Sequence, residues 1–245
     1  MRIEQQPGFV LHARPWRETS LLLELLSRDH GRVGLVARGV RGARSRLSRS
    51  VLQPLTPLLV GWSGAGELAT LTAAEAAGAP LAMSGEALLC ALYVNELVAR
   101  LVPRNDAHAE VFDAYLAALT RLAGSDTPAW TLRRFERDLL AQLGYGAVLD
   151  SEAESGVALA PDNHYAYRLD SGPVPWRGAE DGLRLRGSAL LALAQDRQPP
   201  VDDLRALRRL MRALIAHHLG GKDLQAWSLF HASPPPADSA AGEQG

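Results

Sequence analysis

The sequence contains a single cysteine, Cys90, among its 245 residues. One cysteine excludes an intrachain disulfide, and it also excludes a zinc site built from several thiolates. Cys90 lies inside the apolar run 87–92, so we expect a buried thiol that takes no part in redox chemistry. The composition, with 47% hydrophobic and 22% charged residues, excludes a wholly disordered or collagen-like chain.

Long hydrophobic runs are missing as well. No apolar stretch approaches the roughly 20 residues that a helix needs to cross a bilayer. The segment that begins at Met1 does not resemble the apolar core of a secretory signal. We therefore expect a soluble protein of the cytoplasm.

Familiar catalytic motifs are also missing. The glycines and lysine at 220–222 lack the upstream glycine and downstream hydroxyl of a phosphate-binding loop. The string Trp62-Ser63-Gly64 lacks the context of a nucleophile elbow. We therefore expect that the protein is not an enzyme and needs no cofactor. A metal-dependent nuclease stays open as an alternative, because its carboxylates can lie far apart in the sequence.

Lysine is almost absent, because 25 of the 26 basic residues are arginines and only Lys222 is a lysine. The formal net charge is −1, but the charges are unevenly distributed. Residues 1–80 hold ten arginines and six acidic residues, whereas the rest of the chain holds 16 basic and 21 acidic residues. A basic first part joined to an acidic remainder indicates a polyanionic partner for the first part.

Half of the arginines in this first part are concentrated in residues 38–49, where no acidic residue occurs. The residues are Arg38, Arg41, Arg44, Arg46 and Arg49, and Arg32 lies shortly upstream. Guanidinium groups match the geometry of phosphates, and Gly39 and Gly42 allow the backbone to approach a ligand closely. We expect these six arginines to bind DNA; a solvated loop that is kept soluble by its charge is the alternative.

Aromatic residues make up only 6% of the chain. In the first part, the candidates for stacking on bases are Phe9, Trp16 and Trp62, and each also fits the core of a small domain. With so few aromatic residues, contact with the sugar–phosphate backbone is favoured over recognition of a base sequence.

Short strands separated by turn signals are predicted between Gly8 and about Ala77. They lie near 9–14, 20–26, 33–37, 52–62 and 67–72. The leucine-rich second segment also fits a helix. Five short strands in a segment of this size predict an oligonucleotide/oligosaccharide-binding (OB) barrel, with an SH3-like barrel as the nearest alternative.

Beyond Pro80 the apolar period becomes helical. Helices are predicted over 86–102, 111–122, 128–143, 187–195 and 201–219. Between them, residues 147–187 are rich in glycine, proline and acidic residues, with one strand-like piece at 164–169. We expect an irregular insertion there, with room for a hairpin.

These patterns together predict an α+β chain of two domains. An OB domain spans 1–79, and a mainly helical domain that contains the insertion spans 80–232. A tail, 233–245, lacks large apolar residues, and we expect it to be disordered.

Two of the predicted helices carry arginines beside apolar residues. In the helix 128–143, Arg133 and Arg134 adjoin Phe135, and a basic rim on an apolar groove suits an acidic peptide with a hydrophobic end. In the helix 201–219, four arginines lie opposite the leucines, where an ordinary solvated face is the simpler explanation. These four are Arg205, Arg208, Arg209 and Arg212.

Several strings along the chain follow one another in the order of a known family. They are Phe9–Ser20, Gly31–Val33, Ala37–Gly39, Leu52–Pro57, Tyr93–Leu97, Leu132–Glu136, Leu143–Gly146 and Leu219–Lys222. Together they resemble the RecO family of bacterial DNA repair and recombination mediators. The resemblance covers most of the chain, and its strength lies in the collinearity of the strings rather than in any one of them.

The resemblance implies binding of single- and double-stranded DNA and annealing of complementary strands. It implies a partnership with RecR, with which the family helps RecA replace single-stranded DNA-binding protein (SSB) in recombinational gap repair. It also implies that the helical domain binds the acidic C-terminal tail of SSB, and we expect Arg133, Arg134 and Phe135 to do so. We further expect a monomer in the bacterial cytoplasm, associated with the nucleoid during repair.

Some RecO proteins carry a four-cysteine zinc site after the Leu-Gly-Tyr-Gly string. Residues 147–187 of this chain contain no cysteine, so we expect no metal there and an insertion held by packing alone. The main rival interpretation is a protein–protein adaptor without direct DNA binding, whose basic loop contacts an acidic partner.

Overall fold

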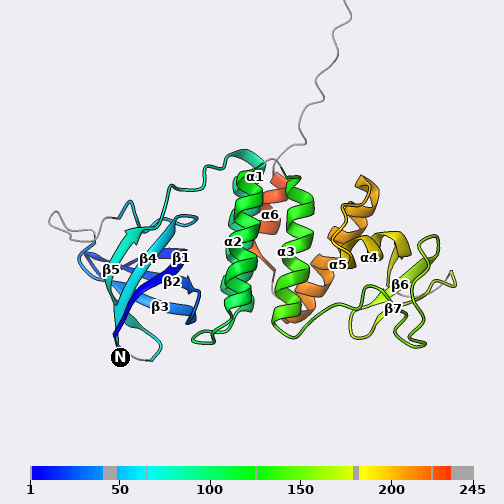
Figure 1. Cartoon of the computed structure of the whole chain (residues 1–245), viewed down its shortest axis with the longest axis horizontal. Helices are drawn as coiled ribbons and strands as arrows, with labels where there is room; N and C mark the ends of the chain where they lie inside the picture. Colours follow the sequence, from blue (N-terminus) through cyan, green and yellow to red (C-terminus); the bar gives the residue numbers. More distant parts are fainter. Residues whose placement is uncertain are drawn as a thin grey trace, which may run out of the picture.

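A β-barrel, a group of helices and a small sheet follow one another along the molecule (Figure 1). The computed structural model describes residues 2–40, 49–64, 66–124, 126–178, 182–221 and 223–232. Arg41, Arg44 and Arg46 of the predicted DNA-binding set, and the tail 233–245, lie outside these described residues.

Five strands form the barrel. They are β1 (Arg2–Trp16), β2 (Ser20–Ser27), β3 (Gly31–Ala37), β4 (Pro57–Ser63) and β5 (Ala69–Ala76). Their order is β1-β2-β3-β5-β4, and pairing of β1 with β4 closes the barrel. Neighbouring strands are antiparallel except for β3 and β5. This five-stranded barrel confirms the expected OB architecture.

The leucine-rich segment that also fitted a helix is the strand β2. Leu21, Leu23 and Leu25 fill the barrel core, whereas Leu26 packs with residues of the helical domain. Because both faces of β2 are buried, its sequence lacks the alternation that marks a half-exposed strand.

The first, fourth and fifth strands differ from their predicted limits, and β5 ends four residues later than predicted, at Ala76. β1 is 15 residues long because its first half pairs with β4 and its second half with β2. β4 begins only at Pro57, since residues 52–56 form turns in which Leu55 takes a left-handed conformation with φ of 66°. Proline and a positive φ both interrupt the ladder that the apolar pattern alone predicts.

In the part of the chain that the structure describes, six helices follow the barrel. They are α1 (Gly85–Leu101), α2 (Ala109–Ala123), α3 (Pro128–Gln142), α4 (Gly187–Ala194), α5 (Val201–His218) and α6 (Gln225–Ala232). The first five lie within two residues of their predicted limits. The apolar period does not predict α6, because eight residues are too few to establish it. None of the described helices is long and apolar enough to span a membrane.

A shared core joins the barrel to the helices. The ring of Phe9 on β1 lies 5.7 Å from that of Phe112 and 5.1 Å from that of Tyr115, both on α2. The Asn95 side chain donates to the Leu11 carbonyl at 3.3 Å and accepts from the Tyr115 hydroxyl at 2.6 Å. The buried contacts and hydrogen bonds set the orientation of the barrel relative to α1 and α2.

The backbone at the start of β3 lies close to the backbone that connects α1 and α2. Gly31 has a φ of 63°, and a Cβ added there would lie 1.8 Å from the carbonyl oxygen of Asp106. Gly31→Ala is therefore expected to destabilise the protein by about 2–4 kcal/mol, through backbone displacement added to the left-handed conformation. Urea unfolding followed by circular dichroism measures this change.

Gly39→Ala is the matched control for this prediction. Gly39 has a similar φ of 69°, but an added Cβ meets no described atom within 4 Å. It should lose only about 1 kcal/mol. Equal losses for the two variants would show that the contact with Asp106 is unimportant.

The insertion folds around a three-stranded sheet. Its strands are β6 (His164–Arg168), β7 (Gly172–Pro175) and β8 (Leu183–Arg186), in the order β7-β6-β8. Tyr165, Tyr167 and Leu185 join the core of the helical domain. The segment is therefore more regular than its composition suggests. Among the described residues, no three His, Cys, Asp or Glu side chains are placed to hold a metal ion.

Candidate nucleic-acid interface

One end of the barrel points away from the helical domain. Trp16 at the end of β1 pairs with Ser20 at the start of β2, and Leu21 pairs with Ala37 at the end of β3. The turn between β1 and β2 therefore lies beside the point where the chain leaves β3 for residues 38–49. We call this region the basic end of the barrel.

Four exposed arginines of the described chain belong to the strands and connections at the basic end. They are Arg14, Arg17, Arg38 and Arg49. None of the four forms an ion pair with another described residue, whereas Arg2 on β1 pairs with Glu4. Glu18 lies in the same turn as Arg17. The basic end thus presents guanidinium groups that are available to phosphates.

Buried residues fix both ends of the arginine-rich segment. Val40 and Leu52 are 5% and 1% exposed, and both pack in the barrel core. The described chain on both sides of residues 41–48 is therefore anchored in the barrel. Arg41, Arg44 and Arg46 fall between these two anchors in the sequence and lie outside the described residues.

Of the three candidate stacking residues, two are buried. Phe9 and Trp62 are 2% and 5% exposed and belong to hydrophobic cores. Trp16 is only half-buried and lies at the basic end, where it is the one candidate that a base could reach.

Arg32 lies apart from the other predicted DNA-binding arginines. It is the second residue of β3, and six residue steps along the strand place it about 20 Å from Arg38. Its side chain donates to the Ala99 carbonyl at 2.7 Å and pairs with Glu24 at 3.5 Å. Burial lowers the pKa of this guanidinium. Arg32 therefore connects the barrel to α1. Its position near the loop in the sequence did not reveal this contact.

Helix α3 places its arginines differently from the expected basic rim. Arg133 is buried and donates from Nε to Glu136 Oε2 at 2.6 Å, and the Tyr93 hydroxyl donates to the same carboxylate at 2.7 Å. Phe135 is 1% exposed in the core. These two residues of the predicted tail-binding set thus lie inside the helical domain, because α3 packs against α1, α2 and α5.

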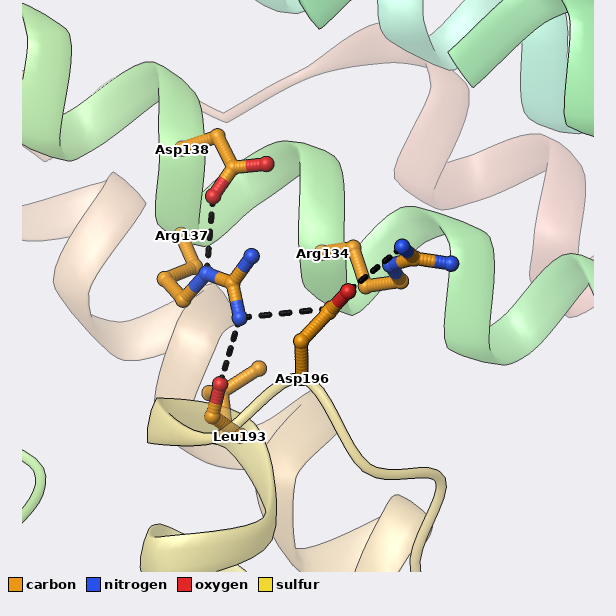
Figure 2. Close-up of polar contacts among 5 residues, drawn as sticks. All are labelled: Arg134, Arg137, Asp138, Leu193 and Asp196. Atoms are coloured by element: carbon orange, nitrogen blue, oxygen red, sulfur yellow. Dashed lines mark hydrogen bonds and ion pairs between the residues drawn. The ribbon is translucent and has the colours of Figure 1, made fainter. Parts of the chain in front are cut away.

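The other two arginines of α3 contact the end of α4 and the loop that follows it (Figure 2). Arg134 pairs with Asp196 at 2.5 Å. Arg137 donates to the Leu193 carbonyl at 2.5 Å and to Asp138 at 2.7 Å, and it lies 3.4 Å from Asp196. Both side chains hold α3 against this loop, and helical spacing could not have revealed their partners.

A small pocket opens between α1, α3, α5 and α6. Its volume is about 70 Å³, and it is lined by Glu86, Cys90, Tyr93, Ala129, Leu132, Arg133, Glu136, Arg208, Arg212 and Trp227. Arg212 lies over the Trp227 ring at 4.4 Å. Burial raises the pKa of the Cys90 thiol to about 12, so the thiol stays neutral. The pocket combines apolar walls with Arg208 and Arg212 of α5. The helical pattern predicted an ordinary solvated face for these two arginines.

Glu96 positions the wall of this pocket that α6 supplies. Its two carboxylate oxygens accept hydrogen bonds from the backbone N–H groups of Gln225 and Ala226, each at 2.8 Å. A carboxylate at a helix N-terminus accepts hydrogen bonds from unpaired N–H groups and interacts favourably with the positive end of the helix dipole. The contact holds Trp227, the next residue along α6, in place against α1.

Both parts of the chain match family models. Residues 1–80 match the model described as Recombination protein O N terminal, and residues 83–227 match Recombination protein O C terminal. Relatives named DNA repair protein RecO cover almost the whole chain. The protein of Aromatoleum aromaticum is 47% identical over 92% of this chain and 94% of its own. That of Methylococcus capsulatus is 45% identical over 95% of both chains. That of Stenotrophomonas maltophilia strain K279a is 47% identical over 96% of this chain and 99% of its own.

Proposed function

The chain belongs to the RecO family of DNA repair proteins, and from this membership we propose that it is a DNA-binding recombination mediator. It anneals complementary strands and, together with RecR, helps load RecA on single-stranded DNA that SSB covers. It acts by binding rather than by catalysis. Its place of action is the bacterial cytoplasm, at the nucleoid during repair. The OB domain (1–79) holds DNA, and the helical domain (80–232) holds protein partners.

The basic end of the barrel is the observation that carries this proposal. Arg14, Arg17, Arg38 and Arg49 are exposed there without ion pairs to described residues, and the arginine-rich segment 41–48 begins and ends beside them. Phosphate contacts supply affinity without sequence preference. Arginines on two adjoining connections neutralise the phosphates of two strands and so keep them close enough to pair.

A strand-annealing assay tests the proposal directly. We expect the protein to accelerate pairing of two complementary oligonucleotides, bare or covered with SSB, and to do so less well as salt rises. RecR together with this protein should speed RecA assembly on SSB-covered DNA. Failure to bind a mixed-sequence oligonucleotide at low salt would favour the adaptor interpretation instead. Cleavage of DNA in the presence of Mg²⁺ or Mn²⁺ would point to the nuclease.

For the acidic tail of SSB, the pocket between α1, α3, α5 and α6 is the proposed site. Apolar walls from Leu132 and Trp227 suit a hydrophobic end group, and the guanidinium groups of Arg208 and Arg212 suit carboxylates. Arg133 forms the floor of the pocket and contributes its charge from beneath, although Glu136 already pairs with it. Arg134 and Phe135 support the site through the packing of α3.

Replacing the rim arginines should weaken this contact. The double variant Arg208→Ala/Arg212→Ala is expected to bind a peptide of the SSB tail about tenfold less tightly, because charge-assisted contacts are lost. Arg205→Ala on the same helix, which does not line the pocket and pairs with Asp202, is the control and should bind normally. Isothermal titration of the peptide measures both. Wild-type affinity in the double variant would reject the pocket as the tail site.

A further inference from the structure

The small sheet at the far end of the molecule presents a basic and aromatic face that the proposed function does not use. The strand register places His164 beside Arg186 in one cross-strand row, and it places Ala166 beside Val174 and Arg184 in the next. Trp176 follows β7 directly and donates its backbone N–H to the His164 carbonyl at 2.9 Å. Because side chains alternate along strands, these rows lie on the opposite side of the sheet from Leu185. Within them Ala166 and Val174 are buried, whereas Arg184 and Arg186 are exposed.

A hollow of about 370 Å³ is formed by residues of this face together with Tyr165 and Pro175 of the other face. It is lined by Asp162, Asn163, His164, Tyr165, Pro175, Trp176 and Arg184. The Arg184 guanidinium lies 5.6 Å from the centre of the Trp176 ring, which is half-buried. An indole ring supported by a guanidinium is a platform on which an unpaired base can stack.

The charge of the face favours phosphate. Arg184 and Arg186 are exposed, two residues apart on one strand, and neither forms an ion pair with a described residue. Of the nearby acidic residues, Asp162 lines the hollow, and Glu180 and Asp181 lie outside the described residues. The Cα atoms of the two arginines lie about 7 Å apart along the strand, so their side chains can contact successive parts of one backbone.

We infer that this face binds a segment of single-stranded DNA, separately from the barrel. An amphipathic peptide fits less well, because Trp176 is the one large apolar side chain that the described hollow offers without being buried. A duplex fits less well too, because stacking on Trp176 requires an unpaired base. The inference rests on the proposed DNA-binding function and adds a second strand-binding surface to it.

The location of the sheet affects how one protein molecule can hold DNA. The helices lie between the barrel and the small sheet, so the two surfaces are at opposite ends of the molecule (Figure 1). One protein molecule can therefore hold a single strand at the sheet while the barrel holds another DNA segment. A gap in duplex DNA offers both kinds of segment.

Binding of a labelled oligothymidine of about 20 nucleotides and of a mixed-sequence duplex, measured by fluorescence anisotropy, tests the inference. Arg184→Ala/Arg186→Ala is expected to lower single-strand affinity about tenfold and to reduce the salt slope by about 1.4, which corresponds to two phosphates. Duplex affinity should change less than about twofold, because the barrel is intact. Trp176→Ala should weaken single-strand binding several-fold, and Trp176→Phe should restore it because phenylalanine still stacks.

Arg205→Ala on α5 is the matched control, since it removes an exposed arginine outside this face. Single-strand affinity at the wild-type level in both the arginine and the tryptophan variants would overturn the inference and leave the barrel proposal standing. Equal losses on single strand and duplex would overturn the assignment to single strands. If the wild-type protein bound neither the single strand nor the duplex, the proposed function itself would be rejected.

Discussion

Alanine at Arg41, Arg44 and Arg46 is expected to lower the affinity for DNA by about 100-fold near 0.1 M salt. Each phosphate contact contributes a slope of about 0.7–0.9 to the dependence of log affinity on log salt, so the slope should fall by roughly 2–3. The segment has no acidic residue, and Val40 and Leu52 fix its ends at the barrel. Anisotropy titrations at several salt concentrations between about 0.05 and 0.2 M measure both quantities.

The matched control removes the same number of charges elsewhere. Arg197, Arg205 and Arg209 are exposed in the helical domain, away from the basic end. Their triple replacement with alanine should leave the salt slope within about half a unit of wild type. If the control loses as much affinity as the loop variant, net charge rather than the basic end determines binding. An unchanged slope in the loop variant would remove the segment from the interface.

The second large effect concerns stability. Arg133→Met is expected to destabilise the protein by about 3–5 kcal/mol, because it leaves the Glu136 carboxylate buried without its cation. Arg133 is 5% exposed and Glu136 1%, and the Tyr93 hydroxyl donates to the same carboxylate. For a protein of this size, each kcal/mol lowers the melting temperature by about 2–4 °C, so a loss near 10 °C is expected. Differential scanning calorimetry measures it.

Two further variants separate the buried charge from the packing of α3. Arg133→Met/Glu136→Leu removes both charges and should recover most of the loss. Arg134→Met breaks the partly exposed pair with Asp196 and should cost about 1 kcal/mol or less. If Arg133→Met and Arg134→Met melt alike, the buried pair contributes no more to stability than the partly exposed one.

The difference in burial between Arg133 and the pocket's other arginines affects how a peptide site on the helical domain can be tested. A variant without Arg133 changes the fold of the pocket floor as well as its charge, so loss of peptide binding there has two explanations. Arg208 and Arg212 lie at the rim of the same pocket and are not part of the buried pair with Glu136. Their replacement is therefore the more specific test.

The outline of the molecule could be predicted from local patterns. Turn signals and short apolar runs predicted a small barrel, and the apolar period predicted five of the helices within two residues. Both signals are local, because a strand or a long helix shows its buried face in its own sequence. The leucine run of β2 was ambiguous since both of its faces are buried, and α6 was missed because it is short.

The candidate sites depended more on tertiary structure. Helical spacing predicted that Arg133 and Arg134 lie on a polar rim. In the structure Arg133 pairs with Glu136. Arg134 pairs with Asp196, which is 62 positions away in the chain. Arg32 lies near the loop arginines in sequence, yet a whole strand separates it from them. A sequence shows which residues are charged and which share a helix face, but not which neighbours will neutralise them.

The sequence by itself determined the fold class, the family and the concentration of positive charge in the first part of the chain. Composition, apolar period and the order of short strings carry those properties, and none of them requires knowledge of long-range contacts. Only the tertiary structure decided which arginines face solvent. It also formed the pocket of α1, α3, α5 and α6 and the basic face of the small sheet. The pocket is made of residues far apart in the chain, and packing of four helices brings them together. The face of the small sheet comes from residues 162–186, and the pairing of three strands brings these together.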